Sequence, residues 1–223
     1  MVPALALCPF LYFHQSELFR HKPRQSFTSV RDTLIGIEEG TKIKQRRFTF
    51  DGIIADQGQA IDWPNWRGPN HNGISDESDW FKQWPSSGPA SLWTASVGTG
   101  FATVSVSDGR VFTMGNKSNR DQVIALDDVT GNELWRHSYS EKLTANLYDG
   151  GPNATPTVDG NNVYTLSKTG KAYCFKAESG EVVWTKDLKR LYNAQVPKWG
   201  FASSPLIQGN QVVYNVGTRG VAL

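Results

Sequence analysis

Few residues of this chain have the types and spacing that catalysis or metal binding requires. The four histidines, His14, His21, His71 and His137, stand too far apart to present two metal ligands from one short element. The run 149–153 lacks the periodic oxygen ligands of a calcium loop, and a connecting loop explains it better. The hydroxyl residues Thr103, Ser203 and Ser204 have no partnered histidine and base, so nucleophilic catalysis has little support. We therefore predict no catalytic residue and no metal site in this sequence.

Two loops that combine glycine with aromatic residues are the best candidates for binding. Residues 99–101 read Thr-Gly-Phe, and residues 199–201 read Trp-Gly-Phe, an offset of 100. Loops held by a rigid scaffold commonly carry binding residues. Repetition of one structural unit explains the Gly-Phe pair equally simply, and we regard that interpretation as the stronger. A protein or small-molecule ligand is expected on this loop face, with Trp199, Gly200 and Phe201 as candidate contacts.

A hairpin pattern occurs twice, at residues 125–135 and 174–184, separated by 49 positions. In each copy a strand ends, a turn closes on glycine, and tryptophan follows four residues later. Asp127 and Thr130 can hydrogen-bond to turn amides, and Gly131 tolerates the positive φ of a tight turn. The acidic residues of the first turn are therefore interpreted as structural. A large flat side chain once per repeat predicts a wedge between neighbouring sheets.

The repeat is wider than the hairpin. Gly109, Gly160 and Gly209 close similar segments at spacings of 51 and 49, and a β-rich run follows each. One unit thus contains four strands in about 50 residues, the size of a propeller blade. The predicted fold is an all-β propeller of four-stranded blades, present in part: one closing strand, two blades and most of a third.

The first hairpin resembles the tryptophan-docking motif A-x-D-x-x-T-G-x-x-x-W of quinoprotein-type β-propellers. The second copy keeps the glycine and the tryptophan and replaces the other motif residues. Residues 62–75 also resemble the start of bacterial pyrroloquinoline-quinone-like (PQQ-like) repeat proteins, so the resemblance extends over roughly residues 62–223. The motif positions are Ala125, Asp127, Thr130, Gly131 and Trp135 in the first copy, and Gly180 and Trp184 in the second.

The resemblance implies an extracytoplasmic protein with one of two roles. The first is a non-enzymatic binding or scaffold module of the bacterial envelope. The alternative is a PQQ-dependent alcohol or polyol dehydrogenase whose active-site residues lie in blades outside this sequence. PQQ and calcium are implied by the family alone, because no adjacent cysteine pair and no acidic family motif occurs here. The first 13 residues lack a clear signal peptide, so the location rests on the resemblance as well.

Composition excludes other classes. Eight of the 23 Lys and Arg and six of the 21 Asp and Glu lie in the first 60 residues, which leaves fifteen of each afterwards. No basic surface for nucleic acid is expected. No run approaches the roughly 18 apolar residues of a membrane span. Cys8 and Cys174 lie in different regions, which favours free thiols over a disulfide.

Three regions are predicted. Residues 1–60 form a poorly ordered extension, residues 61–91 an irregular strap, and residues 92–223 the partial propeller. The strap is expected to pack on the propeller through four tryptophans. The strand that begins at 92–93 is expected to find its partners at the far end of the chain, because closure removes exposed sheet edges. The strap tryptophans are Trp63, Trp66, Trp80 and Trp84.

Overall fold

The computed structural model describes residues 61–77, 86, 88–89, 91–144, 149–217 and 220–223, with strand assignments also at β1 (Ser16–Phe19), β2 (Thr49–Phe50) and β3 (Ile53–Ile54). The chain forms two compact units. The first comprises Met1–Arg20, Asp62–Ser75 and Ser91–Leu223; the second comprises His21–Ile61 and Asp76–Ala90. In the second unit β2 pairs antiparallel with β3. The expectations for most of residues 1–60 and for Trp80 and Trp84 fall outside the described residues.

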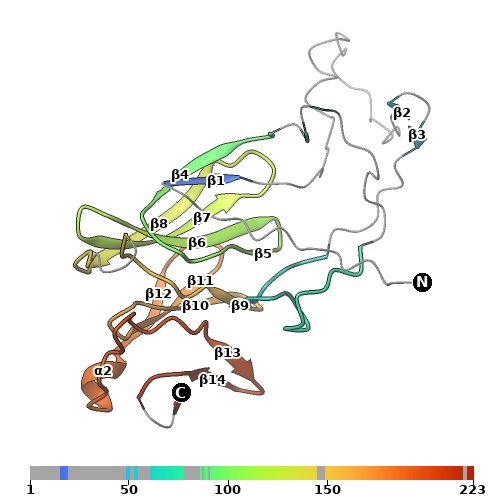
Figure 1. The fold of residues 1–223 in the computed structure, drawn as a ribbon. Helices are drawn as coiled ribbons and strands as arrows, with labels where there is room; N and C mark the ends of the chain where they lie inside the picture. Colours follow the sequence, from blue (N-terminus) through green and yellow to red (C-terminus); the bar gives the residue numbers. More distant parts are fainter. Residues whose placement is uncertain are drawn as a thin grey trace. The chain divides into compact units, whose positions relative to one another are not determined.

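The first unit is built from antiparallel sheets whose strands follow chain order (Figure 1). Two sheets have four strands and a third has three, which confirms the predicted all-β architecture of two blades and most of a third. The first sheet contains β5 (Ser105–Ser107), β6 (Arg110–Lys117), β7 (Arg120–Asp127) and β8 (Glu133–Ser140). The second contains β9 (Thr157–Asp159), β10 (Asn162–Leu166), β11 (Lys171–Lys176) and β12 (Val182–Asp187). The third contains β13 (Leu206–Gln208), β14 (Gln211–Tyr214) and β15 (Val221–Ala222).

The strand β4 (Thr94–Gly98) has a partner that the sequence did not indicate. It pairs antiparallel with β1, from the N-terminal region, rather than with strands from the far end of the chain. Thr99, directly after β4, forms an antiparallel bridge with Asn116 at the end of β6. Both interactions satisfy backbone groups that an isolated strand would leave open. Across the described residues, no helix has the length and apolar character needed to cross a bilayer.

The short first strands of the sheets lie beside one another: β5 contacts β9, and β9 contacts β13. The segment 62–64 adds to this inner region. The backbones of Trp63 and Val106 exchange two hydrogen bonds, of 2.7 and 2.9 Å, and the Val158 amide donates to the Pro64 carbonyl at 2.9 Å. The strap therefore joins the first two sheets through its backbone. Trp66, expected to pack on the sheets, is instead 51% exposed, with the Arg67 guanidinium 5.7 Å from its ring centroid.

The core fills the space between successive sheets. Apolar residues of β6, β7 and β8 pack against residues of β10 and β11 from the second sheet. A second cluster joins the second sheet, α2 (Leu188–Leu191) and the third sheet. Burial of such side chains contributes about 25 cal/mol per Å² of apolar area, which makes these faces the main source of stability. The first cluster includes Phe112, Met114, Trp135, Tyr139, Val163 and Phe175.

The Trp135 indole lies between the first and second sheets. Its Nε1 donates to the Ala177 carbonyl at 2.8 Å, and a Cβ placed on Gly180 would lie 2.6 Å from the ring. Trp93 repeats the arrangement one sheet earlier: its Nε1 donates to the Asp128 carbonyl at 3.2 Å, and its ring covers Gly131. Each glycine thus lacks the side chain that would clash with the indole of the preceding sheet, and the ring packs directly against the glycine backbone.

The turn that carries Gly131 is stabilised by its own side chains. One carboxylate oxygen of Asp127 accepts hydrogen bonds from the amides of Val129 and Thr130, at 3.2 and 2.7 Å, and from the Thr130 hydroxyl at 2.7 Å. Ala125, fully buried, is the cross-strand partner of Trp135. The motif residues therefore hold the turn in the shape that receives the indole.

Trp184 occupies the corresponding position in the second sheet, opposite Cys174. Its side chain is half-buried and lines a hollow of about 400 Å³ together with Tyr164, Ile207 and Leu223. Cys174 itself is a buried free thiol, as expected from the sequence.

Substitution of Gly180 by alanine tests the contact between indole and glycine. The new Cβ would collide with the Trp135 ring at a residue whose φ is +71°, so we expect both strain and overpacking. Gly160→Ala is the matched control, because φ is +50° there and no atom lies within 4 Å of the added Cβ. Left-handed strain costs about 1–2 kcal/mol, and overpacking adds about 1–3 kcal/mol. Urea unfolding should show a larger decrease in the free energy of unfolding for Gly180→Ala than for Gly160→Ala. Equal decreases would contradict a specific contact between Gly180 and the Trp135 indole.

Candidate functional site: the loop face

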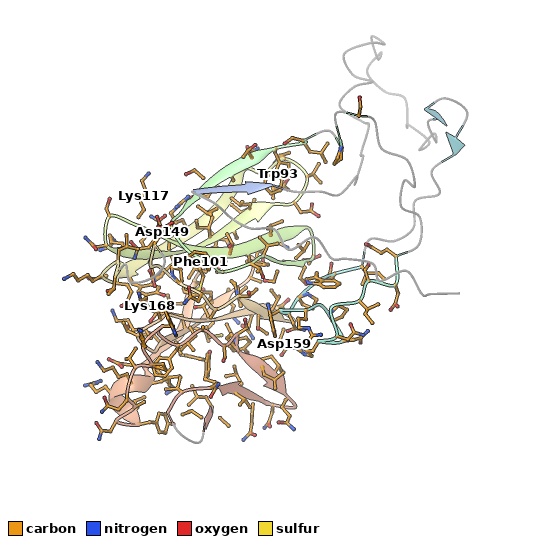
Figure 2. All side chains as sticks on the ribbon, viewed as in Figure 1. Trp93, Phe101, Lys117, Asp149, Asp159 and Lys168 are labelled. Atoms are coloured by element: carbon orange, nitrogen blue, oxygen red, sulfur yellow. The ribbon has the colours of Figure 1, made fainter. Side chains whose placement is uncertain are left out.

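The loops that precede the inner strands lie at one end of the sheets. Figure 2 shows Phe101, Lys117, Asp149 and Lys168 at this end, whereas Trp93 lies toward the opposite end. We call this end the loop face. It contains residues 99–103, 149–155 and 188–204, with the hairpin turns 118–119 and 167–170.

A chain of hydroxyl groups links the three inner segments beneath the loop face. The hydroxyls of Thr103 and Thr155 lie 2.8 Å apart, and the Thr103 amide also donates to the Thr155 hydroxyl at 3.3 Å. The Thr155 amide in turn donates to the Ser204 hydroxyl at 3.0 Å. The Ser203 hydroxyl accepts from Asn215 at 3.2 Å. These hydroxyl groups therefore hold neighbouring segments together.

The three candidate contacts of the segment 199–201 have different environments. Phe201 is 4% exposed and belongs to the core between the second and third sheets. Gly200 has φ of +79°, and an added Cβ would lie 2.7 Å from the Lys168 Cβ, so glycine permits this close approach. Trp199 is 41% exposed, with the Lys198 ammonium 5.2 Å from its ring centroid. Trp199 is therefore the member of the three that can contact a ligand.

Phe101, one hundred positions before Phe201, is 40% exposed. Its amide and the next one both donate to the Pro152 carbonyl, at 2.8 and 3.2 Å. The equivalent position thus turns its ring outward on one loop and inward on the other. The difference follows from the neighbour: Phe201 packs with Leu188 in a buried cluster, whereas Phe101 belongs to no buried cluster among the described residues.

The segment from α2 to Trp199 presents exposed apolar and basic side chains together. Asp187 caps α2 by accepting from the Arg190 amide at 3.0 Å, and the Leu188 amide donates to the Gly170 carbonyl at 2.9 Å. These anchors fix a short helix whose exposed residues face solvent. We call the following exposed residues the α2 patch: Lys189, Arg190, Leu191, Tyr192, Lys198 and Trp199.

The α2 patch is positively charged. Its three basic residues have one acidic neighbour in the segment 187–199, Asp187, whose carboxylate serves the helix cap. Arg and Trp are among the residues most often found at the centres of protein interfaces. The arrangement can bind an acidic segment that also carries apolar side chains.

Among the histidines, His137 has structural surroundings. His137 packs against the rings of Tyr173 and Phe175 at centroid distances of 5.4 and 5.0 Å. Burial, followed by the charge of Arg120, lowers the pKa of His137. Within the described part of the chain no group of three or more His, Cys, Asp or Glu could hold a metal ion.

One cluster of titratable residues gave no signal in the sequence. Asp121 lies on β7 and is fully buried, and burial is the first cause that raises its pKa from 3.8 to about 7. In the sequence, Arg120-Asp121-Gln122 has the composition of a solvated hairpin end. Nothing in this local pattern shows that the carboxyl is buried.

The comparisons with known proteins agree with the repeat. The family described as outer membrane protein assembly factor BamB matches residues 84–152 and 120–223. The outer membrane protein assembly factor BamB of Nitrosomonas eutropha is 34% identical over 91 residues, which are 39% of this chain and 21% of that protein. The chain therefore spans about a fifth of the length of this relative.

Two solved structures share part of the fold. BamB from Moraxella catarrhalis has a TM-score of 0.42 and 16% identity, over 57% of this chain and 34% of that one. The quinohemoprotein alcohol dehydrogenase from Comamonas testosteroni has a TM-score of 0.41 and 19% identity, over 59% of this chain and 25% of that one. Because the family match extends from residue 84 to residue 223, more than half of the sequence, the chain belongs to the PQQ-like β-propeller repeat family described as outer membrane protein assembly factor BamB.

Proposed function

We propose that the chain is part of a non-enzymatic propeller scaffold of the bacterial envelope that binds a protein segment on its loop face. The relatives named as outer membrane protein assembly factors support an extracytoplasmic location and a protein partner. The observation that carries the proposal is the α2 patch, where Trp199 is exposed beside basic residues.

The chemistry of the patch defines the partner. Exposed Trp199, Leu191 and Tyr192 offer apolar area, and Lys189 and Arg190 offer positive charge. An aromatic ring covered by a cation gains affinity when a ligand removes water from it. The favoured ligand is therefore an acidic protein segment with interspersed apolar side chains.

Trp199→Ala should weaken binding of such a segment by about tenfold or more, because an interface tryptophan commonly contributes over 1.4 kcal/mol. The probe is a fluorescently labelled synthetic peptide that alternates glutamate and leucine, with its binding measured by anisotropy. Trp66→Ala is the matched control, since Trp66 is also exposed beneath a cation but belongs to the strap.

An equal loss of affinity in both tryptophan variants would contradict a specific role of the loop face. Equal binding of a second peptide, with lysine in place of each glutamate, would contradict the acidic character of the partner.

Charge reversal provides an independent prediction. The double variant Lys189→Glu and Arg190→Glu should abolish most binding of the acidic peptide, and salt should weaken the wild-type complex because the contacts are exposed. Lys176→Glu is the control, since Lys176 is exposed beside the turn that carries Gly180, away from the loop face. Titration of the peptide at low and high ionic strength measures both effects. Salt-independent binding would show that charge does not select the ligand.

A further inference from the structure

A buried carboxyl and a buried amide face each other at the end of the β6–β7 hairpin. Asp121 and Asn116 are cross-strand partners, and their exposed fractions are 0% and 3%. The Asn116 Nδ2 donates to Asp121 Oδ1 at 2.8 Å and to the Glu141 backbone carbonyl at 2.8 Å. Both protons of the amide nitrogen are therefore used.

The two remaining oxygens of this pair, Asn116 Oδ1 and Asp121 Oδ2, are buried and have no hydrogen-bond partner. An ionised carboxylate and an amide oxygen are both acceptors, so they cannot bond to each other. A single proton on Oδ2 turns the carboxyl into a donor toward the amide oxygen. One proton would thus satisfy both atoms and close an acid–amide pair with two hydrogen bonds. The buried Tyr139 hydroxyl, on the cross-strand neighbour of Asp121, could donate to Asp121 Oδ2 but would still leave the buried Asn116 Oδ1 unpaired, which is costly.

The cations near this pair are already engaged. The Lys171 Nζ lies 3.3 Å from Glu141 Oε2 and donates to the Ser140 carbonyl at 2.5 Å. The Lys168 Nζ donates to the Thr144 carbonyl at 2.9 Å. Neither lysine makes a direct contact with the Asp121 carboxyl among the hydrogen bonds and ion pairs of the described residues.

The same cluster joins the first sheet to the second. The Thr169 hydroxyl donates to Glu141 Oε2 at 2.9 Å, and the rings of Tyr139 and Tyr173 stack at a centroid distance of 4.6 Å. Burial first, and then the charges of Asp121 and Glu141, raise the pKa of the Tyr139 hydroxyl, and hydrogen bonding to Asp121 raises it further. A change of charge on Asp121 therefore acts directly on the contact between sheets.

We propose that Asp121 is a proton-operated switch at the junction of the first two sheets. With the proton bound, its carboxyl is neutral and closes the pair with Asn116. When the proton is released to solvent, a second negative charge appears beside Glu141 and competes for Lys171, which weakens the hold of the first sheet on β11 and the turn 167–170. The turn 167–170 also contacts α2, since the Gly170 carbonyl accepts from the Leu188 amide, but the proposal does not rest on the proposed function.

The direction of the effect follows from proton linkage. The pKa of Asp121 is about 7 in the folded protein, raised by burial and by Glu141 and lowered by Asn116, Lys171 and Lys168, against 3.8 as a reference. At a pH between these two pKa values, Asp121 therefore keeps its proton in the folded chain and has lost it in the unfolded chain. Stability from this group is fully present below about pH 4 and is lost as the pH rises to about 7, so the unfolding constant rises by up to about tenfold per pH unit.

Asp121→Asn tests the switch, because the new amide can donate to Asn116 Oδ1 while its oxygen still accepts from Asn116 Nδ2. It is a neutral copy of the protonated pair. Urea unfolding of the whole chain between pH 4 and pH 8 should show a steeper pH dependence in the wild type than in Asp121→Asn. The exposed carboxyl of Asp159 supplies the control, and Asp159→Asn should follow the wild type. Parallel curves for the wild type and Asp121→Asn would overturn the proposal.

Infrared spectroscopy of the wild-type chain tests the same proposal even if the Asp121→Asn variant does not fold. The wild-type chain should show the carbonyl band of a protonated carboxylic acid one unit below a pKa of about 7, and this band should disappear one unit above it. Asn116→Leu should shift the midpoint of the band's loss, since the amide that pairs with the carboxyl is removed. A wild-type spectrum without such a band at the lower pH would overturn the proposal.

Discussion

The structure depends on the contact between one flat aromatic ring and one glycine. The Trp135 indole can lie on the second sheet only because Gly180 has no side chain, and its N–H finds a carbonyl on the same turn. The contact brings apolar packing and a satisfied polar group to one point. It also sets the distance between consecutive sheets, because the ring fills the space between their outer strands. Trp93 and Gly131 repeat the arrangement, so the geometry is passed from blade to blade.

Fixed spacing between blades gives the loop face its shape. Hydrogen bonds among Thr103, Thr155 and Ser204 join the inner segments from which the loops extend. The α2 patch is attached to the core by Leu188, whose side chain is fully buried. A binding surface on a rigid support loses little conformational entropy when a partner arrives. A rigid support of this kind is what the proposed binding role requires.

The sequence predicted the sheets well because their causes are local and periodic. Glycine spacing, alternation of apolar residues and the turn chemistry of Asp127 and Thr130 are all visible in one strand or hairpin. The pairing of β4 with β1 was not predicted, because the N-terminal region that contains β1 shows no repeat and no sustained period in its sequence. Trp66 was expected to be packed, yet it is half exposed, with the Arg67 guanidinium near its ring. The Asn116 and Asp121 pair was missed because the local sequence Arg120-Asp121-Gln122 has the composition of an exposed hairpin end, whereas Asp121 is buried.

The strap has a further consequence for what can enter the middle of the fold. Innermost strands of a propeller normally leave one line of amides and carbonyls open toward the central lumen, where an extended peptide could be added as a new strand. Here Trp63 already occupies that line on β5, and Pro64 takes the Val158 amide on β9. An extended peptide therefore cannot add to β5 at Val106 or to the Val158 amide of β9, because the segment 63–64 already uses these backbone groups.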